Sequence, residues 1–172
     1  MATPFPIFKT ERLHLREIKL SDAHRIHYLR SDEEITKFIK RSELQTFDTT
    51  VAHIKKIRNQ LRRNQSIAWG ISLHTSTELI GSICLWNFSE DKKTAEVGYD
   101  LDTKFQNKGF MSEALKAILN YGFTQKGFET IVAYTDYRNI PSKNLLKRFG
   151  FIPSNTLKDT DNQNNVVFYL NR

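Results

Sequence analysis

The sequence predicts a mixed α/β domain with one twisted, mostly antiparallel sheet of about six or seven strands and helices on both faces. A length of 172 residues suits one domain, residues 1–172, with a single core. β-rich runs alternate with amphipathic helical segments along the chain, which favours a layered sheet-and-helix packing. The three middle runs are joined by short turns, and short connections imply antiparallel hairpins.

The first half of the chain reads as one strand followed by helices. Residues 13–18 alternate apolar and polar side chains, as a half-buried strand does. Helical segments follow near residues 22–29 and 32–38, and a longer helix carries apolar residues three or four positions apart. The candidate N-caps of the first and last of these helices are Ser21 or Asp22, and Asp48 or Thr49.

The second half begins with β-rich runs and continues as an alternation of helices and strands. Turn material at residues 74–77 and 89–93 separates the β-rich runs. The expected elements are strands at 67–73, 78–88 and 94–102, a helix near 109–125, a strand at 130–136, a helix at 141–148, and two final strand-like runs ending at 166–170.

The formal net charge of +7 favours anionic partners such as nucleic acid, an acidic protein surface or a polyphosphate cofactor. Part of the charge lies in the longer helix of the first half. A solvated helix face is one interpretation, and contact with a ribosome or nucleic acid is the other. The basic residues concerned are Lys55, Lys56, Arg58, Arg62 and Arg63.

Several protein classes are disfavoured by composition. No apolar stretch approaches the roughly 18 to 20 residues that span a bilayer, and residues 1–12 lack the apolar core of a signal peptide, so we expect a cytoplasmic protein without membrane association. Cys84 is the only cysteine, which excludes an intrachain disulfide framework. The five histidines have no metal-ligand spacing, so no metal site is expected.

The first candidate site is a loop-to-helix junction after a strand that ends near Leu101. The first amides of a helix lack intrahelical partners and point at the loop, where the helix dipole favours an anion such as pyrophosphate. Gly109 has no Cβ, so a phosphate can approach the backbone closely, and Gln106 and Lys108 can add a donor and a positive charge. A plain helix start, with Gly109 relieving a tight turn, is the alternative.

A second junction follows the strand at 130–136. Asn139 suits an N-cap, Pro141 suits the first helical turn, and Gly150 stands where a helix-terminating glycine is expected. This structural interpretation leaves only the choice of Ser142 unexplained.

Four segments, in order from residue 10 to residue 151, resemble the GNAT superfamily of N-acetyltransferases. Residues 106–111 (QNKGFM) resemble its acyl-CoA pyrophosphate loop, R/Q-x-x-G-x-G/A, with Met111 in place of the small residue. Residues 139–151 resemble its N-x-x-S-x-x-h-h-x-x-x-G-F segment, where h is apolar. Residues 10–16 (TERLHLR) and 95–101 (AEVGYDL) resemble the branch that acetylates alanine or serine N-termini of ribosomal proteins.

The resemblance implies acetyl-CoA as co-substrate, without a metal. It implies that Asn139 contacts the pantetheine arm, and that the strand ending at Leu101 splays from the strand beginning near Thr130 to expose backbone groups for the thioester. The residues implied in cofactor binding are Leu101, Gln106, Asn107, Lys108, Gly109, Phe110, Met111, Ser112 and Asn139.

For the chemistry, Glu96 is the candidate base and Ser142 the candidate acid, chosen over Tyr137 because the family places a hydroxyl at this helix start. Glu96 is predicted on the strand face opposite Ala95, Val97, Tyr99 and Leu101, where an acceptor groove could lie, and Asp100 shares that face. An exposed strand glutamate and a local capping serine are the alternatives. Tyr134 and Trp86 are candidate pocket residues.

The expected function is transfer of the acetyl group of acetyl-CoA to a primary amine, such as the α-amine of a ribosomal protein. A small-molecule amine, either an antibiotic or a polyamine, is an alternative acceptor. A non-catalytic CoA sensor and a basic nucleic-acid-binding module are alternative functions. Acceptor specificity is expected in residues 31–47 and in the last hairpin, and a homodimer would be unsurprising.

Overall fold

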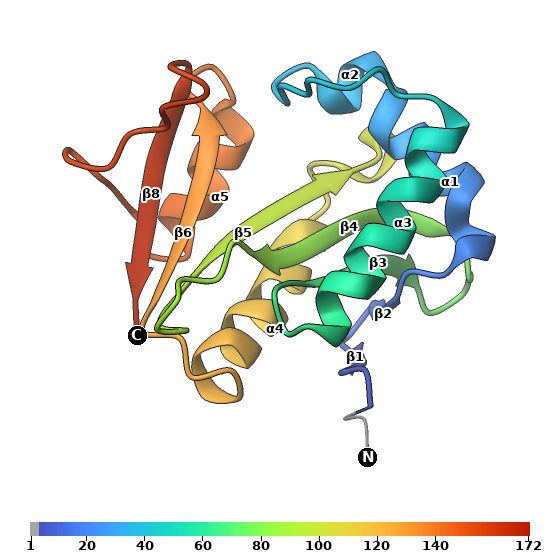
Figure 1. The fold of residues 1–172 in the computed structure, drawn as a ribbon, viewed down its shortest axis with the longest axis horizontal. Coiled ribbons are helices and arrows are strands. Elements are labelled where there is room, and N and C mark those ends of the chain that lie inside the picture. The colour runs from blue at the N-terminus through green and yellow to red at the C-terminus, as the bar shows by residue number, and fades with distance from the viewer. Residues whose placement is uncertain (1–3) are drawn as a thin grey trace.

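The computed structural model describes residues 4–172, and it consists of one eight-stranded sheet with helices on both faces (Figure 1). The strands are β1 (Phe8–Lys9), β2 (Leu13–Glu17), β3 (Ile67–Leu73), β4 (Leu79–Trp86), β5 (Thr94–Leu101), β6 (Thr130–Asp136), β7 (Ile152–Pro153) and β8 (Asn165–Asn171). The α-helices are α1 (Ala23–Ser31), α2 (Glu33–Thr36), α3 (Phe47–Arg62), α4 (Phe110–Thr124) and α5 (Ile140–Arg148), with 3₁₀ turns η1 (Leu20–Asp22) and η2 (Thr103–Phe105).

The order of strands in the sheet is β1-β2-β3-β4-β5-β6-β8-β7, and only the β5–β6 pair is parallel. The mixed, mostly antiparallel architecture expected from the sequence is therefore confirmed. The sheet has one strand more than the upper expected number. The additional strand is the two-residue β1, which is too short to leave an alternating pattern in the sequence.

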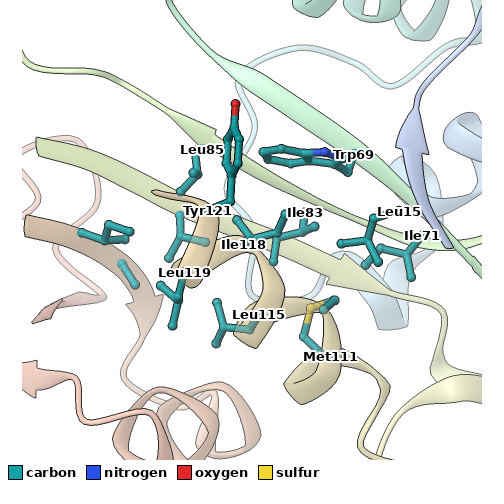
Figure 2. Close-up of a cluster of buried hydrophobic side chains, with 14 of the residues drawn as sticks. Leu15, Trp69, Ile71, Ile83, Leu85, Met111, Leu115, Ile118, Leu119 and Tyr121 are labelled. Atoms are coloured by element: carbon teal, nitrogen blue, oxygen red, sulfur yellow. The ribbon is translucent and has the colours of Figure 1, made fainter. Parts of the chain in front are cut away.

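The side chains of β3 show how the two faces are covered. Trp69 and Ile71 point into the larger core beneath α4, whereas Ala68 packs against the smaller cluster beneath α1 and α3. In Figure 2 the apolar side of α4, including Leu115 and Ile118, lies against the strand side chains. No helix within residues 4–172 is long and apolar enough to cross a membrane.

The capping interactions of two helices differ from the expected ones. Helix α3 begins at Phe47 because Thr46 is its cap: the Thr46 hydroxyl accepts from the Thr49 amide at 3.2 Å, and the Thr49 hydroxyl accepts from the Thr46 amide at 2.9 Å. Asp22 precedes α1, but its carboxylate pairs with Arg16 at 2.9 Å instead of capping the helix. In both cases the helix is where the sequence predicts it, and only the capping interaction differs.

Strands β5 and β6 pair only where they begin. Their register joins Thr94 to Thr130, Ala95 to Ile131 and Glu96 to Val132, and stops there. Beyond this point the two strands diverge, as Figure 1 shows, and each keeps its other neighbour. Residues 97–101 of β5 therefore have no strand partner on one edge, so backbone polar groups there are left for another partner.

Candidate active site

A cleft of about 1210 Å³ occupies the splay between β5 and β6. Residues from both faces of β5 line it: Glu96 and Asp100 from one face, and Tyr99 and Leu101 from the other. The cleft therefore passes through the sheet. The other sequence-predicted residues that line it are Gln106, Asn107, Gly109, Phe110, Met111, Ser112, Asn139 and Ser142. Lys108 is not among its lining residues.

The N-terminus of α4 faces this cleft. Gly109 is the N-cap, with a φ of 79°, a left-handed conformation that glycine adopts without strain. The first amide with a helical partner is that of Glu113, which donates to the Gly109 carbonyl at 3.1 Å. The amides of residues 110–112 precede it and have no intrahelical acceptor, so they form an anion-binding end.

Two polar side chains of the loop have partners within the loop. The Gln106 amide donates to the Leu101 carbonyl at 2.8 Å, and the Lys108 ammonium donates to the Lys104 carbonyl at 2.8 Å. Gln106 thus ties the loop to the end of β5. The positive charge of Lys108, expected at the cleft, is bound to the Lys104 carbonyl instead, and Lys108 does not line the cleft.

The N-terminal segment clamps the loop and helix α4 from behind. The Arg12 guanidinium donates to the Lys108 carbonyl at 2.9 Å and pairs with Glu113 at 2.8 Å. A Cβ on Gly109 would lie 3.3 Å from Arg12, so a larger residue would crowd this clamp. Glu113 also accepts the Thr10 hydroxyl and the Arg12 amide at 2.7 Å. The 10–16 segment therefore fixes the helix start.

Met111 does not obstruct the anion-binding end. Its side chain is 8% exposed and belongs to the larger core, which Figure 2 shows. A side chain directed into the core leaves the backbone amide free to face the cleft. Met111 can therefore stand where the resembled loop has a small residue, because its side chain packs in the core and not in the cleft.

Arg148 is a cleft residue that the sequence analysis missed. It lies in the last turn of α5, and its guanidinium donates to the Ser112 hydroxyl in the first turn of α4 at 3.3 Å. A guanidinium beside free helix amides adds a full positive charge to the anion-binding end. Only the contact between the two helices, 36 positions apart in the chain, reveals this role.

Asp102 anchors the start of the loop. Its carboxylate is almost completely buried, pairs with Arg25 and accepts the Lys104 amide at 3.0 Å. Burial alone would raise the pKa of Asp102, but the hydrogen bonds from Arg25 and Lys104 outweigh it and lower the pKa. Asp102 therefore stays ionised and holds the loop against α1.

The second junction forms as the sequence predicts. The Asn139 side-chain oxygen accepts the Ser142 amide at 3.2 Å, which makes Asn139 the N-cap of α5. Gly150, with a φ of 86°, follows the helix. Because only the Asn139 oxygen is used in the cap, its amide nitrogen is left for another acceptor. The Ser142 hydroxyl lies 2.8 Å from the Tyr99 hydroxyl, a contact that the sequence did not reveal.

Glu96 lies on the predicted strand face, opposite the core side of β5, and lines the cleft. Trp86 is its register partner on β4, and the Asn87 amide reaches its carboxylate at 3.5 Å. Burial raises the pKa of Glu96 to about 7; the Asn87 hydrogen bond opposes this rise and the charge of Asp159 adds to it. A carboxyl group with this pKa can accept or give a proton near neutrality.

The remaining candidates differ in position. Burial raises the pKa of Asp100. Its carboxylate accepts hydrogen bonds from both the amide and the hydroxyl of Ser82 at 3.0 Å, and these bonds connect β5 to β4. Trp86 and Tyr134 line the cleft as expected, whereas Tyr137 is 54% exposed and lies outside it. Among residues 4–172 no three His, Cys, Asp or Glu side chains are grouped to hold a metal ion.

Two loops meet above the outer part of the cleft. The Lys40 ammonium, after α2, donates to the Asp161 carbonyl, before β8, at 3.1 Å. The Arg138 guanidinium lies 5.7 Å from the Phe38 ring centroid. Residues 31–47 and the last hairpin, the two regions expected to carry specificity, therefore lie side by side around this part of the cleft.

Comparisons with known proteins agree with this geometry. A family model described as an acetyltransferase (GNAT) domain matches residues 12–152. The uncharacterized N-acetyltransferase YoaA of Bacillus subtilis (strain 168) is 29% identical over 167 residues, covering 97% of this chain and 94% of its own. The ribosomal-protein-serine acetyltransferase of Escherichia coli (strain K12) is 35% identical over 95 residues, 55% of this chain and 52% of its own.

The fold is also shared with solved structures. RimL, a ribosomal α-N-protein acetyltransferase in complex with coenzyme A, superposes with a TM-score of 0.85 at 19% identity, covering 96% of this chain and 98% of that one. The match of the family model spans most of the chain, and the splayed strands and the exposed amides of α4 lie within it. The chain belongs to the GNAT family of N-acetyltransferases.

Proposed function

We propose that this N-acetyltransferase transfers the acetyl group of acetyl-CoA to the α-amine of a protein N-terminus. One observation carries the proposal: the anion-binding end of α4 and the unpaired edge of β5 open into one cleft that also holds Glu96 and Ser142. The coenzyme A in the RimL complex supports the choice of acyl donor.

The cleft offers a separate contact for each part of acetyl-CoA. The pyrophosphate is assigned to the amides of residues 110–112, with Arg148 beside them. The pantetheine arm is assigned to the free edge of residues 97–101 and to the amide nitrogen of Asn139. This order brings the thioester to the centre of the splay, near Ser142.

The reaction follows from the positions of the two candidate catalytic residues. The Glu96 carboxylate takes a proton from the ammonium form of the acceptor, and the neutral amine attacks the thioester carbon. Backbone N–H groups of the free β5 edge stabilise the oxyanion of the tetrahedral intermediate. The nitrogen of the intermediate then gives its second proton to water as the C–S bond breaks. Sulfur leaves with the electron pair and takes a proton from the Ser142 hydroxyl, which regains one from the hydronium ion just formed. Glu96 releases its proton to solvent.

The pKa of Glu96 bears on the choice of acceptor. An α-amine has a pKa of about 8, roughly one unit above Glu96, so the proton transfer is uphill by only about 1.4 kcal/mol. A lysine side chain, with a pKa of about 10.4, would cost more than twice as much. The similarity to a ribosomal-protein-serine acetyltransferase points in the same direction.

The test is release of free thiol from acetyl-CoA in the presence of candidate acceptors. Peptides with the N-terminal sequences of ribosomal proteins, the same peptides with a blocked α-amine and one internal lysine, and a polyamine are compared. The proposal predicts turnover only with the free α-amine. Turnover with the polyamine or the blocked peptide would assign the enzyme to another acceptor class, and binding of acetyl-CoA without turnover would favour a sensor.

A further inference from the structure

Two hydroxyl groups meet across the splay of the sheet. Tyr99 extends from β5 and Ser142 from the first turn of α5, and their oxygens lie 2.8 Å apart. Both residues line the cleft. Because β5 and β6 no longer pair at this level, the contact joins the two halves of the sheet at the point assigned to the thioester.

Either hydroxyl could donate in this contact, and the position of Tyr99 favours the tyrosine as donor. The ring packs against the larger core, and Ser142 is the one hydrogen-bond partner of the Tyr99 hydroxyl within residues 4–172. The half-buried phenol has this one partner for its proton, so Tyr99 is taken as the donor and the Ser142 oxygen as the acceptor. Burial raises the pKa of Tyr99 to about 12, so the phenol keeps its proton throughout the working pH range.

A serine that accepts this bond has its own O–H free. The Ser142 amide is already bound by the Asn139 cap, which fixes the backbone, and the bond from Tyr99 fixes the side-chain oxygen. Because Ser142 lines the cleft, its proton can be directed into it. A hydroxyl that accepts one hydrogen bond is also a stronger donor in the next, because the two bonds polarise each other.

We propose that Tyr99 is a positioning residue for Ser142: its hydroxyl holds the Ser142 oxygen so that the serine O–H points at the departing sulfur of coenzyme A. This inference rests on the proposed function, in which Ser142 serves the leaving thiolate. Phenylalanine would fill the same place in the core, so the Tyr99 hydroxyl contributes this contact and nothing else that the structure shows.

The first test compares Tyr99→Phe, Ser142→Ala and the double variant in the thiol-release assay. Tyr99→Phe is expected to lower kcat about 10-fold, with KM and the Kd for acetyl-CoA unchanged, since about 1.4 kcal/mol of leaving-group stabilisation is lost. The double variant is expected to be no slower than Ser142→Ala, because the two hydroxyls act as one unit. Tyr169→Phe, on β8 and outside the cleft, is the matched control.

A second measurement needs no acceptor and no turnover. The thiol of bound coenzyme A is titrated through the ultraviolet absorbance of its thiolate. A hydroxyl aimed at the sulfur stabilises the thiolate, so the thiol pKa is expected to be lower in the wild type and in Tyr169→Phe than in Tyr99→Phe and Ser142→Ala. Failure of the wild type to turn over any amine would count against the proposed function and leave this readout intact.

The inference is overturned if Tyr99→Phe changes neither kcat nor the thiol pKa of bound coenzyme A. It is also overturned if the losses in kcat add in the double variant, because then the two hydroxyls act separately. A Tyr99→Phe variant with wild-type kcat but weaker binding of acetyl-CoA would assign the tyrosine to the shape of the cleft instead.

Discussion

Glu96 shows how the position of one residue on a strand changes its chemistry. An exposed strand glutamate has a pKa well below 7 and is ionised at neutral pH. Burial in the cleft and the nearby charge of Asp159 raise the pKa of Glu96 to about 7. The face on which it lies follows from alternation alone. Its burial depends on the loops that cover the cleft, which the sequence does not reveal.

The pH profile is the corresponding prediction. A base works only when deprotonated, so kcat/KM is expected to rise as the pH passes upward through about 7. Glu96→Gln should remove that rise and lower kcat by about 100-fold or more, within the usual range for general bases. Glu90→Gln, an exposed turn residue, is the control. A wild-type-like profile for Glu96→Gln would rule out Glu96 as the base.

Arg148 carries a prediction about affinity. Replacing it with glutamine removes a positive charge beside the exposed amides of α4, and the Kd for acetyl-CoA is expected to rise about 10-fold, equivalent to about 1.4 kcal/mol. Isothermal titration measures this directly. Lys147→Gln removes an equal charge from a neighbouring exposed position outside the cleft and should have little effect. Equal losses in the two variants would mean that only overall charge matters.

At the scale of elements, what the sequence predicted well is local. The Asn139 cap, the glycine after α5 and the amphipathic α4 each depend on residues a few positions apart. What it missed are contacts between distant segments. The Tyr99 and Ser142 hydroxyls are 43 positions apart, and no periodicity or capping pattern records that β5 and α5 meet.

The splay of β5 from β6 was predicted, but not from a local pattern in the sequence. Its place was implied by resemblance to a family, because no rule about propensity or alternation tells a strand where to stop pairing. The structure confirms the divergence and gives its start, after Glu96 and Val132. The side chains of Gln106 and Lys108 make local contacts instead, since they donate to the carbonyls of Leu101 and Lys104.

Asn139 allows its two roles to be separated. Asn139→Asp keeps an oxygen that can accept the Ser142 amide, so the thermal midpoint should change little. The aspartate lacks the amide N–H proposed for the pantetheine arm, so the Kd for acetyl-CoA should rise. Asn139→Ala should lose the cap as well, and lower the free energy of unfolding by about 1 kcal/mol. Equal acetyl-CoA affinity in Asn139→Asp and the wild type would leave Asn139 with a capping role alone.

At the scale of the whole molecule, the sheet consists of two halves that join at one end and open at the other (Figure 1). The contact of Tyr99 with Ser142 and that of Lys40 with the Asp161 carbonyl connect the halves across the opening. This arrangement gives a donor and an acceptor separate routes to one point in the sheet.

The positive charge of the molecule is partly accounted for by pairing. Arg58 of α3 pairs with Glu17 at 3.2 Å, while Lys55, Lys56, Arg62 and Arg63 are exposed. Their exposure fits a solvated helix face, and contact with a ribosome or nucleic acid stays a prediction. They lie on α3 or, for Arg63, at its C-cap, and they do not line the cleft.

The most direct test of the central claim is isothermal titration of acetyl-CoA and coenzyme A into the wild type, Gly109→Trp and Gly127→Trp. Both glycines have positive φ, 79° and 75°, so the two variants carry similar backbone strain. Only Gly109 lies at the anion-binding end of α4, whereas a Cβ on Gly127 would meet no atom within 4 Å. We predict micromolar binding to the wild type and to Gly127→Trp, and loss of binding in Gly109→Trp. Equal binding to all three proteins, or no binding to the wild type, would contradict the proposed acetyl-CoA site.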